Sequence, residues 1–433
     1  MNHATSTNCI FPVTNFTQVK DKVLNWANLF STFCFLDNHQ YRFEPHSAEC
    51  ILAAGVADFL EAKPGNALCQ LQKFVEADKR WLFGHFGYDL KNEIEDVRSS
   101  HPDHIQFPDL FFFQPEIIIR FDKKEMIIES ETENEEKIFH EIMGAKKPVS
   151  NKPAQINIQN GIDKDEYISI IQKLLEHILR GDCYEINFCQ EFFAENAVID
   201  PLQLYKKLSI ISPNPFSAFY KLRDKYLLCA SPERFLKKQK NKILSQPIKG
   251  TSKRMADPHK DNESKMELFG SSKDRSENVM IVDLVRNDLS KICLEGTVKA
   301  DELYKIYSFP QVHQMISTVS GELKGGICVA EIIRSTFPMG SMTGAPKKKV
   351  LELIEKYERT KRGIFSGALG YIDPEGDFDF NVVIRSIMYN SANEYLSFQA
   401  GSGITFYSDP QKEWEECLLK AEAIRRVLEC NGV

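Results

Sequence analysis

The chain has 433 residues, of which 42% are hydrophobic and 27% charged, with 54 Lys and Arg against 61 Asp and Glu. This is a globular composition, and a net charge of −7 without a clustered basic face argues against binding to nucleic acid. The sequence contains neither an apolar run of membrane-spanning length nor an N-terminal signal peptide pattern, so we expect no membrane association. Its eleven cysteines lack CxxC spacing, which fits reduced thiols and a cytoplasmic protein.

The first part of the chain is predicted to form short strands, such as residues 33–36 and 111–121, with helices between them. Residues 122–162 are rich in Lys, Glu, Asn and Pro, a composition typical of a linker or an exposed excursion. We therefore divide the chain into an N-terminal α+β portion, residues 1–150, that packs on a second domain, residues 160–433.

The second domain opens with a predicted helix that Asp163 or Asp165 caps and Gly181 ends. Its expected apolar stripe comprises Ile168, Ile171, Leu175, Ile178 and Leu179. Apolar and polar residues then alternate from Tyr184 to Cys189, the pattern of a half-buried strand.

Further strands are predicted at residues 226–229, 364–372 and 395–400. A last helix begins at Ser408 or Asp409, with a proline in its first turn. Strands mixed irregularly with helices favour an α+β fold over a regular βαβ series.

Acidic residues gather on this last helix, where Glu413, Glu416 and Lys420 follow at spacings of three and four and share one face. The pattern has two readings. It is either a solvated acidic first turn or part of an oxygen-rich site for a hard cation such as Mg²⁺.

Two other residues are ambiguous when taken singly. Glu277 stands near the start of a helix predicted over residues 276–289, where carboxylates are common. Lys249 lies on a predicted turn in the segment QPIKGT, where a lysine is usually just solvated.

Nine short segments of the sequence, taken together, help to interpret these residues. They are GDCYEINFCQEF, ASPERF, QPIKGTSKR, ENVMIVDLVRNDL, FPMGSMTGAPK, FSGALGYI, NVVIRSI, AGSGI and DPQKEWEECLLKA. In order and spacing they resemble the chorismate-binding enzymes, which include the large subunits of anthranilate synthase and aminodeoxychorismate synthase as well as the isochorismate and salicylate synthases. The resemblance covers residues 163–430 and implies an α+β fold with a large, sheet-rich, two-layer core flanked by helices. Residues 160–433 would then be the catalytic, chorismate-binding domain.

One residue points to a branch of this family. Anthranilate and isochorismate synthases typically have Ala in the PIxGT block, whereas this chain has Lys249, as aminodeoxychorismate synthases do. The segment WLFGHFGYDLKNEIE, residues 81–95, also looks like the aminodeoxychorismate synthase version. The expected activity is therefore that of aminodeoxychorismate synthase component I, on the route to 4-aminobenzoate and folate. Anthranilate synthase component I and a non-catalytic homologue that only binds an amidotransferase are the alternatives.

The resemblance also implies roles for individual residues. Lys249 would be the nucleophile and Glu233 the general acid, while Glu277, Glu413 and Glu416 would hold Mg²⁺. Chorismate would be bound by a set in which Arg385 grips a carboxylate and backbone N–H groups of the AGSGI block contribute. This set comprises Gly250, Thr251, Gln314, Thr343, Arg385, Gly401, Ser402, Gly403 and Lys420.

Ammonia has to be supplied to such an enzyme, and the chain shows no glutaminase signature. The resemblance implies a separate glutamine amidotransferase subunit as partner. Because the chain ends directly after the last predicted helix, a separate lyase is expected to release pyruvate from the product.

The chain departs from the family pattern in three places. Glu185 stands where most members have Gln and isochorismate-type enzymes have Lys, and a carboxylate there would be costly unless it is paired or protonated. Gln314 replaces a usual His, with His313 beside it. The segment 212–216, which helps relatives to bind tryptophan, reads SPNPF, so tryptophan binding is left open.

Overall fold

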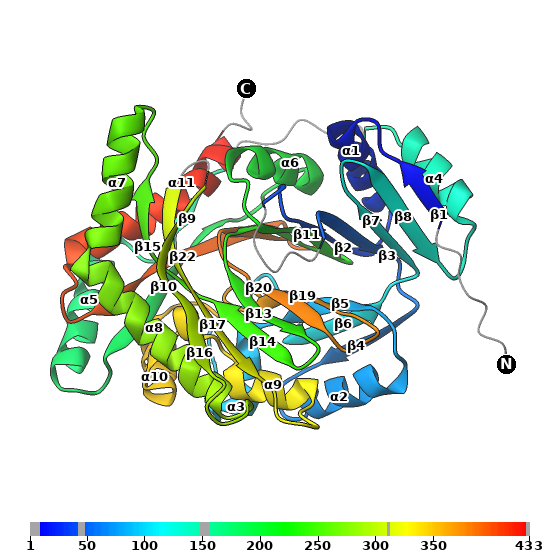
Figure 1. Ribbon diagram of the computed structural model, residues 1–433. Helices are drawn as coiled ribbons and strands as arrows, with labels where there is room; N and C mark the ends of the chain where they lie inside the picture. The colour runs from blue at the N-terminus through cyan, green and yellow to red at the C-terminus, as the bar shows by residue number, and fades with distance from the viewer. Residues whose placement is uncertain (1–8, 42–47, 148–155, 310–311, 430–433) are drawn as a thin grey trace.

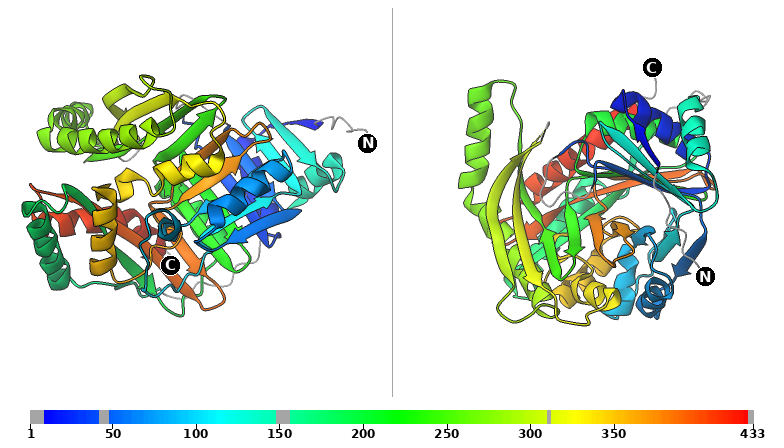
Figure 2. Two further views of the ribbon diagram at one scale, coloured as in Figure 1. Left: turned by 90° about the horizontal axis from the view of Figure 1, so that it is seen from below. Right: turned by 45° about the vertical axis from the view of Figure 1, so that its right-hand side comes forward.

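Two large antiparallel sheets form the centre of the protein, with twelve and ten strands. The computed structural model describes residues 9–41, 48–147, 156–309 and 312–429. The two sheets face each other across a shared hydrophobic core, and helices cover their outer faces (Figures 1 and 2). The predicted α+β fold with a two-layer, sheet-rich core is confirmed.

The first sheet is built entirely from antiparallel neighbours. Its strands, in order across the sheet, are β1 (Cys9–Pro12), β8 (Glu125–Ser130), β7 (Ile117–Phe121), β3 (Cys50–Ala54), β2 (Thr32–Asp37), β11 (Phe216–Leu222), β12 (Lys225–Ser231), β21 (Ser386–Asn390), β22 (Tyr395–Thr405), β10 (Glu185–Ala194) and β18 (Gly344–Ala345), with β9 (Gln159–Asn160) also pairing with β10.

The second sheet carries the segment around Lys249 at one edge. Its strands, in order, are β15 (Ile248–Lys253), β17 (Val312–Glu322), β14 (Lys242–Gln246), β13 (Arg234–Gln239), β20 (Phe378–Val382), β19 (Ala368–Ile372), β5 (Leu82–Phe86), β6 (Leu110–Gln114) and β4 (Asp58–Ala62), with β16 (Lys299–Ser308) also pairing with β17. Strands from both sides of residue 150 contribute to each sheet, so the N-terminal portion is joined to the rest by strand pairing. The exact domain limits stay a prediction.

The helices fall into two groups according to the sheet that they cover. The first sheet packs against α1 (Phe16–Ala27), α4 (Glu135–Gly144), α5 (Lys164–Leu179), α6 (Pro201–Ile211), α10 (Lys347–Tyr357) and α11 (Pro410–Glu429). On the second sheet lie α2 (Ala67–Ala77), α8 (Ser272–Ser290) and α9 (Val329–Thr336), while α7 (Pro258–Gly270) contacts β15. The short elements η1 (Tyr88–Leu90), α3 (Lys91–Ile94) and η2 (Gly340–Met342) complete the described part. Within that part, no helix is both long and apolar enough to cross a membrane.

Local sequence signals explain the ends of α5 and α11. The Asp163 side chain accepts a hydrogen bond from the Glu166 N–H at 2.8 Å, and Gly181 adopts a φ of +82° after α5 ends. Asp409 likewise accepts from the Lys412 N–H, directly before α11. The predicted stripe of α5 was partly wrong, because Leu179 is 68% exposed. The buried side of α5 comprises Tyr167, Ile170, Ile171, Leu174, His177 and Ile178.

Two strand predictions and one linker prediction need correction. Residues 111–121 form two strands in different sheets, because Pro115 lacks an N–H for a continuous ladder and the chain turns between β6 and β7. The strand predicted at 364–372 begins only at Ala368. The supposed linker, residues 122–162, contains β8, α4 and β9, although part of it lies outside the described residues.

Strand β10 is buried on both faces, contrary to the half-buried strand predicted from its alternation. The apolar side chains of Ile186 and Phe188 face the helices, whereas the second sheet covers the side that carries Glu185 and Asn187. Polar residues are therefore enclosed between the two sheets at the start of β10. Tyr184, just before the strand, is 68% exposed.

Candidate functional site

Lys249 lies in an irregular part of β15. Ile248 pairs with Ile316 and Thr251 with Gln314, so the register shifts between them. Gly250 takes a φ of +90°, which favours glycine over any residue with a Cβ. Such a bulge re-aims a side chain, and here Lys249 points across to the other sheet.

The partner of Lys249 is Glu185, at the start of β10. The Lys249 Nζ lies 2.6 Å from the Glu185 Oε1, and their side chains are 11% and 2% exposed. Burial disfavours the charged form of Lys249, but Glu185 and Glu277 outweigh it and raise its pKa above the usual value. The Glu185 carboxylate, which was expected to be unfavourable unless paired, is therefore paired with Lys249.

Gly403 on β22 makes room for this ion pair. A Cβ at that position would lie 2.4 Å from the Lys249 Nζ and 2.9 Å from the Glu185 Oε1. Both distances are shorter than an ordinary contact. The Lys249–Glu185 pair consequently occupies the space that a side chain at position 403 would need.

Glu233 follows β12 in a buried turn and lines a small cavity with Pro247, Gly340 and Ser341. Burial raises its pKa to about 7, although Ser341, Lys249 and Arg385 act in the opposite direction. A carboxyl group with such a pKa is half protonated at neutral pH and can donate a proton.

Arg385 lies between β20 and β21 with a φ of +51°. Burial lowers its pKa, and the Glu233 charge partly offsets this effect. Its guanidinium forms no ion pair or hydrogen bond with any of the described residues. The fork is therefore available to a planar anionic group such as a carboxylate.

Glu277 and Glu413 approach each other from α8 and α11. The Lys273 Nζ lies 3.8 Å from the Glu277 Oε1 and 3.7 Å from the Glu413 Oε1. Burial raises the pKa of Glu277 to about 7, with Lys249 and Lys273 opposing the shift. The two carboxylates from different helices thus share one cation.

Glu416 and Lys420 continue this group one turn further along α11. The Lys420 Nζ lies 2.7 Å from the Glu416 Oε1 and donates a hydrogen bond to the Gly401 carbonyl at 2.9 Å. Lys420 lowers the pKa of Glu416. These contacts connect α11 to the glycine-containing end of β22.

The carboxylate group has the chemistry of a divalent cation site. Glu277 Oε1 and Glu413 Oε2 are buried oxygens without a hydrogen-bond partner among the described residues. Orphaned buried carboxylate oxygens are costly, and a hard cation would satisfy them. Glu277 and Glu413 therefore each offer an oxygen that fits a metal ion, whereas Glu416 is paired with Lys420 in this structure.

The remaining predicted binding residues differ in their burial and in their hydrogen-bond partners. Gln314 is buried, and its Oε1 has no partner in the described structure, whereas the neighbouring His313 faces Asp261 and Ser308. Thr251 opposite Gln314 is exposed.

Two other predicted binding residues direct their side chains into the protein. The Thr343 hydroxyl donates to the Met339 carbonyl at 3.0 Å. Ser402 is fully buried beside Tyr167 of α5, on the helix-covered side, so only its backbone could serve the site.

Three features of the site were missed or misplaced from the sequence. Glu277 lies in the second turn of α8, because Ser271 caps the helix four residues earlier than expected. Lys273 was overlooked, although its position four residues before Glu277 on a helix was a usable signal. Glu185 was noted as a departure but not as a partner of Lys249, since strands from different sheets cannot be aligned from spacing.

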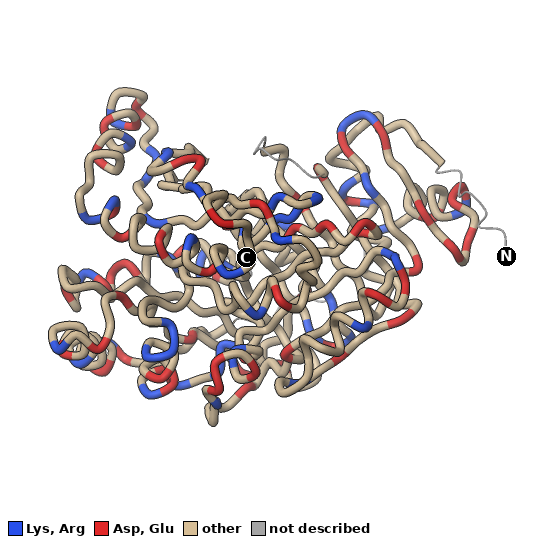
Figure 3. The backbone as a smooth tube through the Cα atoms, turned by 60° about the horizontal axis from the view of Figure 1, so that its bottom comes forward, with Lys and Arg blue, Asp and Glu red and all other residues tan. Residues whose placement is uncertain are grey.

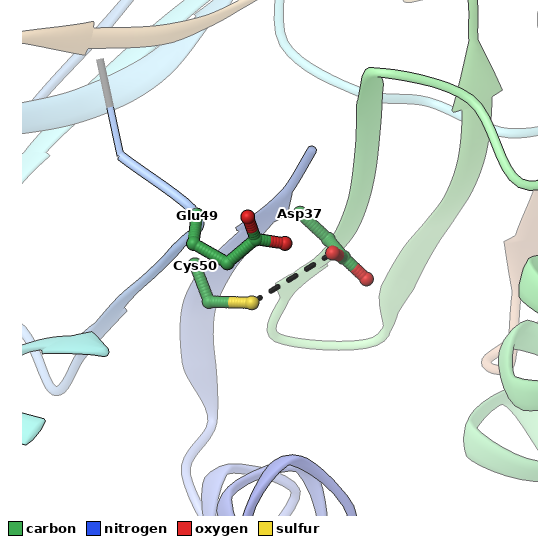
Figure 4. A group of neighbouring side chains, drawn as sticks. All are labelled: Asp37, Glu49 and Cys50. Atoms are coloured by element: carbon green, nitrogen blue, oxygen red, sulfur yellow. Dashed lines mark hydrogen bonds between the residues drawn. The ribbon is translucent and has the colours of Figure 1, made fainter. Parts of the chain in front are cut away.

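A second group of metal-type side chains lies elsewhere. Asp37, Glu49 and Cys50 come together where β2 pairs with β3 (Figure 4). The Cys50 thiol lies 3.7 Å from the Asp37 Oδ1, and Lys20 forms an ion pair with Asp37. Lys20 supplies a positive charge to Asp37, as Lys273 and Lys420 do for the carboxylates of α8 and α11, so a paired lysine does not distinguish the two groups.

Positive charge at the site is a local feature. Acidic and basic positions are interspersed along the backbone (Figure 3). Lys249 and Lys273 are paired with buried carboxylates, and Lys420 is paired with the partly exposed Glu416. Arg385 lies near Glu233.

A family model described as chorismate binding enzyme matches residues 31–426. The chain belongs to this family. It is a chorismate-utilising enzyme, and the region matched includes every element that carries the site.

Two curated relatives of this chorismate-utilising enzyme have names of different kinds. It is 34% identical over 354 residues to an anthranilate synthase component I-like protein of Synechocystis, covering 81% of this chain and 72% of the relative. It is 32% identical over 348 residues to aminodeoxychorismate synthase component 1 of Salmonella typhimurium, covering 80% and 76%.

A solved structure agrees with the fold. Anthranilate synthase component I of Streptococcus pneumoniae superposes with a TM-score of 0.76 at 24% identity, covering 89% of this chain and 94% of that one.

Proposed function

We propose that this chain is component I of aminodeoxychorismate synthase, which converts chorismate and ammonia into 4-amino-4-deoxychorismate for 4-aminobenzoate and folate synthesis. The observation that carries the proposal is the enclosed amine of Lys249, between two sheets and beside four acidic residues. By resemblance, anthranilate synthases have Ala there and lack such an amine. The relative named aminodeoxychorismate synthase component 1 supports the same reading.

Chorismate carries two carboxylates, which require positive partners. The Arg385 guanidinium, which forms no ion pair with any residue of the described ranges, would bind one of them. Glu277, Glu413 and Glu416 would hold Mg²⁺, which when bound supplies positive charge for the other carboxylate. Lys420 and the backbone of residues 401–403 would also bind chorismate. Gly250, Thr251, Gln314 and Thr343 would surround the bound molecule.

The first chemical step forms a covalent bond to the enzyme. The neutral amine of Lys249 adds to C2 of chorismate, the ring double bonds shift toward C4, and the C4–O bond breaks. Glu233 donates its proton to the departing oxygen, which leaves as water. The raised pKa of Glu233, about 7, supports this role because the group retains its proton near neutral pH.

The second step transfers the amino group. Ammonia forms a bond to C4, the C2–N bond breaks, and the electron pair returns to the Lys249 nitrogen. The new C4 ammonium gives a proton back to Glu233. While Lys249 occupies C2, ammonia cannot add at the carbon that anthranilate synthase uses.

A glutamine amidotransferase is the proposed partner. The word component in the relatives' names fits a two-subunit enzyme. Ammonium salts would replace this partner in a test with the isolated chain.

Product identification tests the proposal. The purified chain is incubated with chorismate, ammonium and Mg²⁺, and the products are separated by chromatography. We expect 4-amino-4-deoxychorismate from the native chain and a loss of at least about a hundredfold in Lys249→Ala. Lys253→Ala, at an exposed lysine on the same strand, serves as the matched control and should retain activity.

Three outcomes would contradict the proposal. Anthranilate as the product would favour the anthranilate synthase alternative, which the Synechocystis relative supports. The absence of turnover by a folded chain would favour a non-catalytic homologue. Undiminished turnover by Lys249→Ala would exclude the covalent step.

A further inference from the structure

The Lys249–Glu185 ion pair bridges the two sheets at the centre of the site. Glu185 is fixed at the first position of β10, where it pairs with Thr405 of β22 and Ala345 of β18. Lys249 comes from the bulge of β15 in the other sheet. The carboxylate is therefore on a strand that is paired on both sides, while the amine is on a bulged edge strand.

The pair is not a saturated structural salt bridge. Glu185 Oε1 contacts the Lys249 Nζ at 2.6 Å, but Glu185 Oε2 is buried without any hydrogen-bond partner in the described part of the chain. A carboxylate kept only for stability would be expected to satisfy both oxygens. The space around the pair is also restricted, since Gly403 leaves no room for a Cβ.

A nucleophilic lysine needs a place for its proton. Lys249 carries a positive charge in this structure, because Glu185, Glu277 and Glu416 favour the ammonium over the amine. Only one of these carboxylates lies within ion-pair distance of the Lys249 Nζ. Proton transfer between the two partners needs no movement of either backbone.

We propose that Glu185 is the general base that takes the proton from Lys249. This inference rests on the proposed function. The proton passes from the Lys249 ammonium to Glu185 Oε1, and the freed electron pair forms the bond to C2. When the C2–N bond breaks in the second step, the electron pair returns to nitrogen and Glu185 returns the proton, so the pair ends as it began.

Burial alone would favour the neutral amine of Lys249, but the surrounding carboxylates outweigh it and keep the ammonium. A base in direct contact with the Lys249 Nζ is therefore needed for the amine to react, and Glu185 is in that position. The other charged groups that act on Lys249 are Glu277 from α8, Glu416 from α11 and Glu233 after β12. They lie on different elements from Glu185 and are not within ion-pair distance of the Lys249 Nζ in the described structure.

The test compares Glu185→Gln and Glu185→Asp with the native chain. Gln is nearly isosteric with Glu, and most family members have Gln at this position, so the Glu185→Gln variant should fold. Glu185→Asp retains a carboxylate. The control is Glu191→Gln, which removes another buried carboxylate from the same strand, beside Tyr395. We measure kcat and the KM for chorismate from pH 6 to 9, with total ammonium adjusted to keep free ammonia constant.

We expect Glu185→Gln to lower kcat at pH 7 at least about tenfold, with the KM for chorismate changed by less than about threefold. Its pH optimum should shift upward by about one unit or more, because the Lys249 proton must now leave to solvent. Glu185→Asp should have a lower kcat but keep the native pH profile. Glu191→Gln should match the native chain in both respects.

A native kcat and pH profile in Glu185→Gln would overturn the inference. So would the same upward shift in Glu185→Asp, which decides the question if the Gln variant is unstable. These results differ from failure of the proposed function, in which the native chain forms no 4-amino-4-deoxychorismate or does not depend on Lys249.

Discussion

Gly403→Ala tests whether the space around Lys249 is essential. The added methyl group would lie 2.4 Å from the Lys249 Nζ and 2.9 Å from the Glu185 Oε1. An ordinary contact needs about 3.5 Å, so the amine has to move by about 1 Å. A misplacement of that size can lower the rate by about a hundredfold.

The same substitution should have little effect on folding. Both clashing atoms are ends of flexible side chains, and Gly→Ala in a compatible backbone gains about 0.4–1 kcal/mol through the unfolded state. We therefore expect the free energy of unfolding of Gly403→Ala to stay within about 1 kcal/mol of the native value. Guanidinium unfolding and the chromatographic product assay measure the two effects separately.

Gly401→Ala is the matched comparison on the same strand. Its Cβ would lie 2.0 Å from the Phe188 carbonyl oxygen and 2.7 Å from the Cys189 Cα, which are backbone atoms of β10. Relief requires separation of the paired strands, so this variant should lose about 3 kcal/mol of stability. Native turnover in Gly403→Ala, or native stability in Gly401→Ala, would refute the reasoning.

The other predictions concern three buried carboxyl groups. Glu277→Gln should weaken Mg²⁺ binding in isothermal titration calorimetry at least about tenfold, because it removes a ligand charge, and an unchanged affinity would exclude Glu277 as a ligand. Glu233 must be protonated to act, so kcat/KM should fall as pH rises through about 7. Glu233→Gln should lower kcat by about 10²–10⁴-fold, and a nearly native kcat in that variant would count against the general acid. Burial raises the pKa of Glu191 from 4.5 to about 7. As far as this group is concerned, the folded protein is therefore most stable below about pH 4.5, the pKa of the group in the unfolded chain, and this contribution to stability is lost as pH rises through about 7. The free energy of unfolding of Glu191→Gln, relative to that of the native chain, should therefore rise by at most about 3 kcal/mol between about pH 5 and pH 8. Chemical unfolding of both proteins at these two pH values measures this difference, and no rise would be seen if Glu191 were solvated.

The sequence was sufficient for elements with strong local signals. The last helix was predicted correctly, because α11 starts directly after the capping Asp409, with Pro410 in its first turn. Family blocks also pointed to residues that the fold brings together from both sheets. Lys249, Glu233 and the carboxylates of α8 and α11 act on one another electrostatically.

Features that depend on long-range packing could not be predicted in this way. The alternation in β10 correctly separates its two faces, but nothing local shows that a second sheet covers the polar face. The split at Pro115 sends β6 and β7 into different sheets, which only the complete topology reveals. The pairing of Glu185 with Lys249 joins elements 64 positions apart, and neither segment alone predicts it.

The central claim is that Lys249 forms a covalent bond to chorismate, and mass spectrometry of the Lys249 peptide tests it most directly. The chain is mixed with chorismate and Mg²⁺ in the absence of ammonia, quenched and digested. The account predicts that this peptide gains the mass of chorismate less one water. An unmodified peptide, from a chain that forms 4-amino-4-deoxychorismate once ammonium is added, would contradict it.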